Sequence, residues 1–300
     1  MRVLVTGGKG FLGAWIVRRL LGQGCAVRVF DVAEDRRLVE AIGGARAAEV
    51  AWSLGDIVDG AAVSAAAAGC DAIVHLAGIL TPACQADPVR GAGINLIGTL
   101  NVFEAALAHG ISRVVYTSSA GVYGPDDGMT PRPTTHYGTF KLACEGSARA
   151  YLADRGLASI GFRPFIVYGP GRETGLTAGP SLACRAAARG ESYRIPYGGS
   201  AGLVFVDDVA AAYESAVLRD PAGAHVFNLV GTTVSNDDVI AAIHAVIPNA
   251  AITAGGPALP IVADVDPGQV DDILPGLPQT SLAEGIARTV AFYRQGERLP

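Results

Sequence analysis

A tyrosine and a lysine, Tyr137 and Lys141, stand four residues apart in a stretch of helical character, 137–155. At this spacing the two side chains share one face of a helix, about one turn apart. A lysine ammonium beside a phenol favours the phenolate, so Tyr137 could act as a general base or acid. Ser119 ends the strand-like run "RVVYTSS" and could hold and polarise the same substrate oxygen. Because such a pair also occurs by chance on exposed helix faces, its meaning depends on the surrounding sequence.

Three glycines near the N-terminus, Gly7, Gly10 and Gly13, recur at every third position. They separate an apolar run, 3–5, from a stretch with helical spacing that begins at Phe11. The first glycine permits a tight turn, the second lets a diphosphate approach the main chain, and the third lets the helix pack close on the strand. The N–H groups of the first helical turn would face that diphosphate. The spacing predicts a dinucleotide site, although similar joints occur in folds without a nucleotide.

An acidic residue follows at the distance that a dinucleotide site requires. The next strand-like run, 26–30, ends in Asp31, eighteen residues after Gly13, and an acid about 20 residues beyond the glycines binds the adenosine ribose hydroxyls. A carboxylate there would repel the 2′-phosphate of NADP, so NAD is the predicted cofactor. Arg36 and Arg37 could grip such a phosphate, or lie on a solvated helix face.

The composition excludes several classes of function. Half of the 300 residues are hydrophobic, which is enough for the core of one large or two smaller domains. The net charge of −5 gives no sign of the basic surface that nucleic-acid binding requires. No signal peptide precedes the first strand, and no apolar stretch approaches the ~20 residues of a membrane-spanning helix. The five cysteines lack metal-ligand spacing. We therefore expect a cytoplasmic protein with free thiols, no metal and no membrane contact.

Strand-like and helix-like stretches alternate along the first part of the chain. Beyond those already named, strands are expected at 49–57, 70–78 and 158–164, and helices at 59–68 and 95–109. This alternation predicts an α/β fold, a doubly wound parallel sheet (Rossmann-like), with ligands off the carboxyl ends of the strands. After Gly169 the sequence becomes rich in glycine, and the regular alternation of strand-like and helix-like stretches ends. We expect an NAD-binding domain with the catalytic residues at 1–169 and a smaller, mainly substrate-binding lobe at 170–300, with segments near 203–230 rejoining the core.

Many ordered motifs together carry a family resemblance. They include "TGGKGFLG" at 6–13, "GDI" at 55–57, "HLAG" at 75–78, "TSSAGVYG" at 117–124, "YGTFK" at 137–141, "RPFIVYGPG" at 163–171 and "FVDDVA" at 205–210. The chain resembles the extended short-chain dehydrogenases/reductases, also called the NAD-dependent epimerase/dehydratase family. The resemblance runs from Val3 to about Arg294.

The resemblance implies roles for individual residues. Ser119, Tyr137 and Lys141 match the family's catalytic triad, the latter two also contacting the cofactor. Asn95 matches a helix asparagine that lies near the cofactor, although capping a helix is an equal alternative. The further cofactor contacts are Phe11 and Leu12 at the diphosphate, Asp56 and Ile57 at the adenine, Leu76, Ala77 and Gly78 on the ribose and nicotinamide side, and Phe165 near the nicotinamide.

The chain departs from the family pattern in ways that narrow its function. Family members that eliminate water from nucleotide sugars usually have an Asp-Glu pair after the catalytic hydroxyl, where this chain has Ala120 and Gly121. Nucleotide-sugar epimerases usually hold the substrate diphosphate with residues at three places. Here those places carry Ile166, Ala201 and Asp266. A dehydratase is therefore not expected, and a smaller substrate is.

A single cation could replace the missing anion contacts. Arg172 follows "YGPG" directly and could bind one carboxylate, with Thr81 and Ser119 as further substrate contacts. Other arginines of the second lobe are expected at the surface, namely Arg185, Arg189 and Arg194.

These observations favour an NAD-dependent oxidoreductase that oxidises a secondary alcohol of a small polyol, sugar acid or hydroxy acid. The alternative is a nucleotide-sugar 4-epimerase of the UDP-glucose/galactose type with tightly held NAD. A non-catalytic dinucleotide sensor is disfavoured because the triad residues are all present. The resemblance also implies a homodimer.

Overall fold

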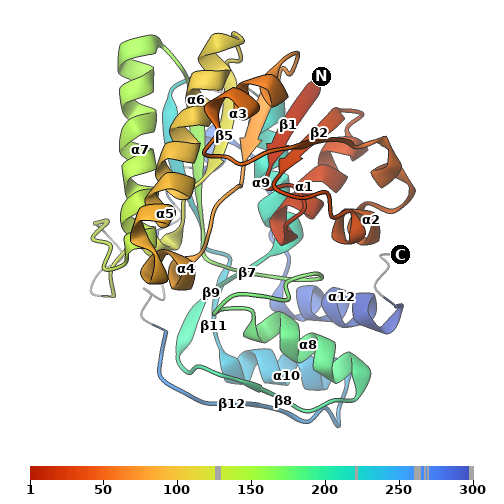
Figure 1. The fold of residues 1–300 in the computed structure, drawn as a ribbon. Coiled ribbons are helices and arrows are strands. Elements are labelled where there is room, and N and C mark those ends of the chain that lie inside the picture. Colours follow the sequence, from red (N-terminus) through yellow and green to blue (C-terminus); the bar gives the residue numbers. More distant parts are fainter. Residues whose placement is uncertain (126–129, 220–221, 260–264, 267, 269, 297–300) are drawn as a thin grey trace.

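Seven parallel strands form the main sheet of the computed structural model, which describes residues 1–125, 130–219, 222–259, 265–266, 268 and 270–296. Their order is β10-β6-β5-β4-β1-β2-β3. Figure 1 labels β5, β1 and β2 of this sheet. The strands are β1 (Arg2–Thr6), β2 (Ala26–Asp31), β3 (Ala51–Leu54), β4 (Ala72–His75), β5 (Arg113–Thr117), β6 (Ser159–Pro164) and β10 (Ala224–Leu229). The first six strands lie in the order 3-2-1-4-5-6 of a doubly wound dinucleotide-binding sheet, seen from the opposite edge. This confirms the predicted Rossmann-like α/β fold.

Each face of the sheet has its own buried cluster, because successive side chains of a strand point to opposite faces. Val3 and Val5 belong to a cluster with the helices of one face, whereas Leu4 belongs to a cluster with those of the other. The first face carries α1 (Phe11–Gly22), α2 (Arg37–Gly43) and α9 (Val206–Arg219), and the second carries α3 (Gly60–Ala67), α6 (Gly98–Ala108) and α7 (His136–Arg155). A sheet covered on both faces needs apolar side chains in both directions, which explains the nearly continuous apolar strands.

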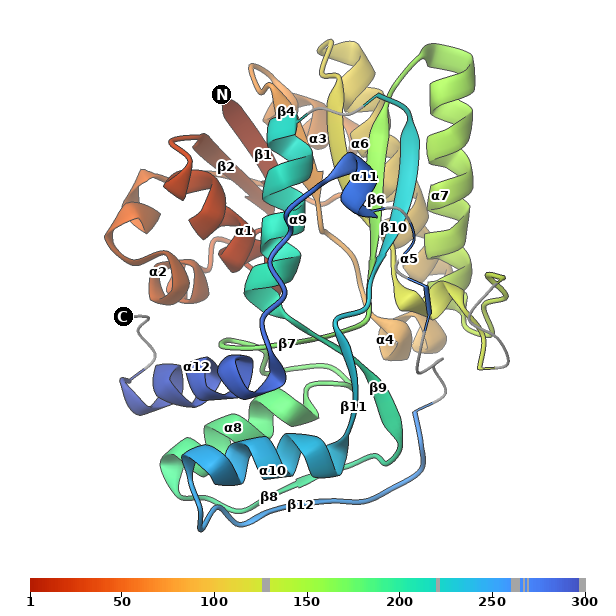
Figure 2. The same ribbon diagram turned by 180° about the vertical axis from the view of Figure 1, so that it is seen from behind.

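The second lobe is built on two small sheets and three helices (Figure 2). One sheet holds β7 (Ile166–Tyr168), β9 (Ser200–Phe205) and β11 (Thr232–Ser235), and the other holds β8 (Tyr193–Ile195) and β12 (Ile252–Ala254). The helices are α8 (Gly179–Arg189), α10 (Asn236–Val246) and α12 (Leu282–Arg294). The described residues also form shorter helical pieces elsewhere in the chain. These are α11 (Val270–Ile273) and the 3-10 helices Gly44–Glu49 and Ala120–Val122, of which the latter two precede the second lobe.

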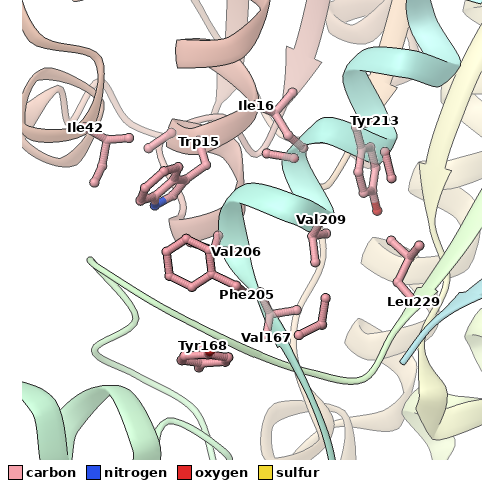
Figure 3. Packing of buried hydrophobic residues seen from close by; sticks show 14 of the residues in the cluster. Trp15, Ile16, Ile42, Val167, Tyr168, Phe205, Val206, Val209, Tyr213 and Leu229 are labelled. Carbon is pink, nitrogen blue, oxygen red and sulfur yellow. The ribbon is translucent and has the colours of Figure 1, made fainter. Parts of the chain in front are cut away.

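An aromatic cluster joins the two lobes. The ring of Trp15 on α1 lies 6.0 Å from that of Phe205 at the end of β9, and Tyr168 of β7 lies 5.6 Å from Phe205 (Figure 3). The indole N–H of Trp15 also donates to the carbonyl oxygen of Pro170, at 3.1 Å. All three rings are fully buried, so the helix that starts at the glycine turn packs directly on the second lobe.

The segment near 203–230 divides between the two lobes. Helix α9 packs along α1, where Arg19 forms ion pairs with Asp207 and Glu214 at 2.7 and 2.8 Å. Strand β10 joins the main sheet beside β6, whereas β9 pairs with β7 and β11 in the second lobe. The division into 1–169 for NAD and 170–300 for the substrate stays a prediction.

One helical stretch of the described residues, Pro88–Ala108, is long and apolar enough to cross a membrane by length and composition alone. The expectation that no stretch approaches this length was therefore wrong. The stretch combines α5 (Pro88–Ala92), a π-helical turn at Gly93–Ile97, and α6, and follows α4 (Thr81–Ala86). It packs against α3 and α7, as the core helix of a soluble protein does.

Candidate active site

The glycine turn between β1 and α1 has the shape that a diphosphate needs. Gly7 has a φ of +69°, and a Cβ there would lie 2.8 Å from the backbone nitrogen of Ala77. A Cβ on Gly13 would lie 2.6 Å from the Cα of Gly8, so the helix can approach this closely only with glycine. Gly10 caps α1 without a side-chain hydrogen bond, and beyond the carbonyl of Gly7 no atom of the described chain crowds its Cβ position. The N–H groups of Phe11 and Leu12 begin the helix and fit an anion.

Asp31 lies at the end of β2 beside the glycine turn, as predicted, but it already has a cationic partner. Its carboxylate lies 3.3 Å from the ammonium of Lys9 and also accepts the Lys9 backbone N–H at 3.3 Å. Arg36 pairs with Glu34 at 2.7 Å and stacks on Trp52. Arg37 pairs with Asp35 at 2.6 Å. Sequence reasoning missed Lys9, whose only signal is a basic residue inside the glycine turn.

The predicted adenine and nicotinamide contacts lie at the carboxyl edge of the same sheet. Asp56 is exposed after β3, and the buried Ile57 packs against Gly98 at the start of α6. The N–H groups of Leu76 and Ala77 point to the Thr6 hydroxyl at 3.3 Å, which fixes the strand end next to Gly7. Gly78 follows and is exposed. Phe165 lies in a separate buried cluster with Ala120 and Val122.

Asn95 does not cap a helix. It is fully buried inside the π-helical turn, where its amide donates to the carbonyl oxygens of Ile79 and Gly91 at 3.0 and 3.2 Å. Its side-chain oxygen accepts the Ile79 N–H at 3.2 Å. A Cβ on Gly78 would lie 2.6 Å from this oxygen and 3.7 Å from the ammonium of Lys141. Asn95 therefore fixes the 78–79 segment beside Lys141.

The three triad residues come together where the N-terminus of α7 meets the end of β5. The Lys141 ammonium donates to the carbonyl oxygen of Thr117 at 2.7 Å and lies 5.8 Å from the centre of the Tyr137 ring. Lys141 is buried, with an exposed fraction of 3%. Ser119 caps the 3-10 helix, and its oxygen accepts the Gly121 N–H at 3.0 Å. This bond uses one acceptor position of the hydroxyl, and its O–H group can still act as a donor.

A glycine on α7, Gly138, allows this close approach. A Cβ on Gly138, next to Tyr137, would overlap the carbonyl oxygen of Gly121. A Cβ on Gly121 would lie 3.5 Å from the Tyr137 ring. Helix α7 begins at this contact because the Thr135 hydroxyl caps it, accepting the Gly138 N–H at 3.1 Å. The phenol and the serine turn are thus held against each other.

Arg172 lies between the glycine turn and the substrate side. Its guanidinium carbon lies 5.5 Å from the centre of the Phe11 ring, and one terminal nitrogen donates to the Thr177 hydroxyl at 3.3 Å. Among the described residues no carboxylate pairs with it, and its Nε is buried without a hydrogen-bond partner. Burial lowers the pKa of the Arg172 guanidinium, while the phenols of Tyr137 and Tyr197 act in the opposite direction. Sequence reasoning missed Tyr197, whose buried hydroxyl also has no partner in the described part of the chain.

The other predicted substrate-side residues have different surroundings. Thr81 begins α4, directly after the half-exposed Leu80. A Cβ on Gly175 would lie within 3.4 Å of both the Leu80 side chain and the Arg172 guanidinium, so α4 starts close to Arg172. Arg185 pairs with Glu173 at 3.0 Å, so its charge is compensated.

Comparison with known proteins agrees with this arrangement. Residues 3–229 match the model of the NAD dependent epimerase/dehydratase family. The chain belongs to this family. As the family is NAD-dependent, the prediction of NAD as cofactor is confirmed, and so is that of an enzyme of the extended short-chain dehydrogenase class. The roles of individual residues, the cytoplasmic location and the homodimer stay predictions.

Several relatives share the architecture over most of the chain. A UDP-glucose 4-epimerase of Mycolicibacterium smegmatis is 32% identical, over 98% of this chain and 99% of that protein. A 2-alkyl-3-oxoalkanoate reductase of Stenotrophomonas maltophilia is 33% identical over 71% of this chain and 64% of that protein. The crystal structure of the Thermus thermophilus UDP-glucose 4-epimerase in complex with NAD has a TM-score of 0.83 and 26% identity, covering 98% of this chain and 99% of that one.

The pairing of Asp31 with Lys9 leads to a prediction about cofactor choice. NAD should bind at least about tenfold more tightly than NADP, a difference of about 1.4 kcal/mol, as Asp31 repels a 2′-phosphate. Lys9→Ala should widen this ratio, because it removes the cation that compensates the carboxylate. Arg37→Ala is the control, since Arg37 pairs with Asp35 and should leave the ratio unchanged. Calorimetric titration measures all three, and equal or tighter binding of NADP would contradict the assignment of Asp31.

The position of Tyr137 leads to a prediction about the base. Tyr137→Phe should keep NAD affinity while turnover falls about 100-fold or more, the usual effect of removing a positioned general base. Lys141→Met should lower both turnover and NAD affinity, since the ammonium is expected to serve the phenolate and the ribose. Tyr151→Phe, on the same helix with its hydroxyl on Glu104, should change neither. Near-normal turnover in Tyr137→Phe would show that another group takes the proton.

Proposed function

We propose that the protein is an NAD-dependent dehydrogenase that oxidises a secondary alcohol of a small polyol, sugar acid or hydroxy acid, with acids preferred. Arg172 is the observation that carries the preference. Arg172 is half-buried, and among the described residues its buried Nε has no hydrogen-bond partner and no carboxylate pairs with it. A substrate carboxylate would supply the missing charge. Burial lowers the pKa of Arg172 and the Tyr137 phenol opposes this shift, which supports a site where the carboxylate and the alcohol belong to one small molecule.

The residues present divide the chemistry between them. When bound, NAD supplies the acceptor for the hydride that leaves the alcohol carbon. The Tyr137 phenolate takes the proton of the alcohol hydroxyl, so the carbon–oxygen single bond becomes a carbonyl. Lys141, fixed by the carbonyl of Thr117, stabilises the phenolate before the transfer. The Ser119 hydroxyl donates to the substrate oxygen as it gains and then loses negative charge.

The three places where epimerases usually hold a diphosphate support a small substrate. Ile166 and Ala201 are buried in the three-stranded sheet, so neither offers a polar group to a ligand. Asp266 carries a negative charge, and its carboxylate accepts the N–H of Gly268. A substrate with two phosphate charges would therefore lack partners at these places.

A second candidate is a nucleotide-sugar 4-epimerase of the UDP-glucose/galactose type. It is favoured by one observation, the similarity to UDP-glucose 4-epimerases over nearly the whole chain, including the second lobe. In that reaction the hydride returns to the other face of the sugar, so no net NADH would form.

The role of Arg172 predicts a preference between matched substrates. Hydroxy acids and their neutral counterparts, such as threonate with threitol and gluconate with glucitol, are compared by NADH formation. The acids should be preferred. Arg172→Met should raise KM for the active acid about 10- to 100-fold, the range of a lost charge-assisted hydrogen bond, and barely change KM for the neutral partner. Arg185→Met is the matched control, because Arg185 is already paired with Glu173.

Two results would contradict the proposal. An equal effect of Arg172→Met on acid and neutral alcohol would remove the carboxylate role. Interconversion of UDP-glucose and UDP-galactose without net NADH would establish the epimerase instead, with other residues of the second lobe holding the diphosphate.

A further inference from the structure

A buried ion pair next to the triad has no part in the chemistry described above. The Arg163 guanidinium on β6 meets the Glu145 carboxylate on α7 through two parallel hydrogen bonds, at 2.7 and 2.6 Å. The Glu145 side chain is fully buried, and the exposed fraction of the Arg163 side chain is 14%. Burying two charges costs several kcal/mol per ion, and such a pair often adds little to stability. The presence of this buried pair beside the triad therefore points to a role in positioning its neighbours.

The pair also holds both ends of the turn that carries Ser119. The Ser118 hydroxyl donates to the Glu145 carboxylate at 2.5 Å, just before the turn. A further nitrogen of Arg163 donates to the Tyr123 hydroxyl at 2.6 Å, just after it, and the guanidinium carbon lies 5.1 Å from the centre of that ring. Ser119 thus lies between two residues fixed by the same ion pair.

The same pair belongs to the helix of the general base. Tyr137, Lys141 and Glu145 are spaced four apart on α7, so they share one helix face. Lys141 reaches the carbonyl of Thr117, and Glu145 reaches Ser118, the next residue of that strand end. Two successive helical turns therefore contact two successive residues leading to Ser119.

We propose that Glu145 and Arg163 are positioning residues, which hold the Ser119 turn in register with Tyr137 by acting through Ser118 and Tyr123. Strand β10 of the main sheet supports the same turn, because the Tyr123 hydroxyl donates to the side-chain oxygen of Asn228 at 3.1 Å. The Asn228 amide in turn donates to the carbonyl oxygen of Asp266 at 2.8 Å. The geometry of the turn does not depend on the proposed function; only the readout of turnover rests on it.

The test changes the outer members of the network, since breaking the ion pair itself would leave a buried charge and endanger folding. Ser118→Ala and Tyr123→Phe each remove one hydroxyl. Their controls are Ser159→Ala, whose buried hydroxyl has no partner in the described residues, and Tyr151→Phe, whose hydroxyl lies on Glu104. Hydrogen exchange is measured on the full chain without substrate or added NAD.

Exchange of the turn amides, those of Gly121, Val122 and Tyr123, should speed up about tenfold in both variants and in neither control. These amides are bonded within the turn, to the Ser119 hydroxyl and to the carbonyls of Ser119 and Ala120. The melting temperature and exchange in the C-terminal half of α7 should be unchanged. Unchanged exchange at the turn would overturn the proposal, and so would a uniform rise with a lowered melting temperature, which would mark a purely stabilising pair.

A turnover readout separates positioning from simple packing. With the alcohol found most active in the screen of acids and neutral partners, both variants should lower kcat about tenfold at unchanged KM and NAD affinity. In a Ser119→Ala background, Ser118→Ala should have no further effect, because the network acts through Ser119. The same loss in that background would overturn the proposal. Should no alcohol be oxidised, the proposed function fails, and the exchange measurement still decides the role of the network.

Discussion

The close approach of α7 to the end of β5 is the contact on which the whole site depends. A Cβ on Gly138 would overlap the carbonyl oxygen of Gly121, so only glycine at 138 lets the Tyr137 phenol approach the turn of Ser119 this closely. The next turns of the helix then reach the strand end with a lysine and a glutamate, at Thr117 and Ser118. If the helix packed one side-chain layer further away, the Ser119 hydroxyl and the Tyr137 phenol would be too far apart to contact the same oxygen atom. The absence of a side chain at Gly138 allows the approach, and hydrogen bonds of Lys141 and Glu145 then fix the strand end.

The local parts of the site could be predicted from the sequence because they lie within short segments. The glycine turn, the aspartate at the end of the second strand and the Tyr–Lys spacing are set by the backbone and by helical periodicity. The alternation of strands and helices likewise predicts the parallel sheet. These features need no knowledge of how distant segments pack.

The parts that were missed all depend on contacts between distant segments. Lys9 and Asp31, Glu145 and Arg163, and Arg172 and Phe11 come from different elements, and no local pattern marks them as partners. The sequence left two roles possible for Asn95, near the cofactor or as a helix cap, because spacing alone does not reveal a π-helical turn. In the structure its side-chain amide forms hydrogen bonds with the backbone of Ile79 and Gly91. The apolar stretch at 88–108 was underestimated for a related reason. Here the sequence predicts a helix only at 95–109, whereas the structure extends the helical stretch back to Pro88.

Arg172 differs from Arg163 and Arg185 in how its charge is compensated. Arg185 has a glutamate partner, and Arg163 has both a glutamate and a tyrosine, so each is complete within the protein. Within the described residues, Arg172 has only a hydroxyl and the face of an aromatic ring as partners, and burial disfavours its charge. An unmet charge of this kind is costly in the free protein and becomes favourable only when an anion arrives. Under the proposed function, binding energy from that anion would hold the alcohol against Tyr137 and Ser119, where hydride transfer requires close alignment. The same proposal would let the predicted triad act on one hydroxyl in each family member while the substrates differ. The charges that the second lobe leaves unpaired would then select the molecule that presents that hydroxyl.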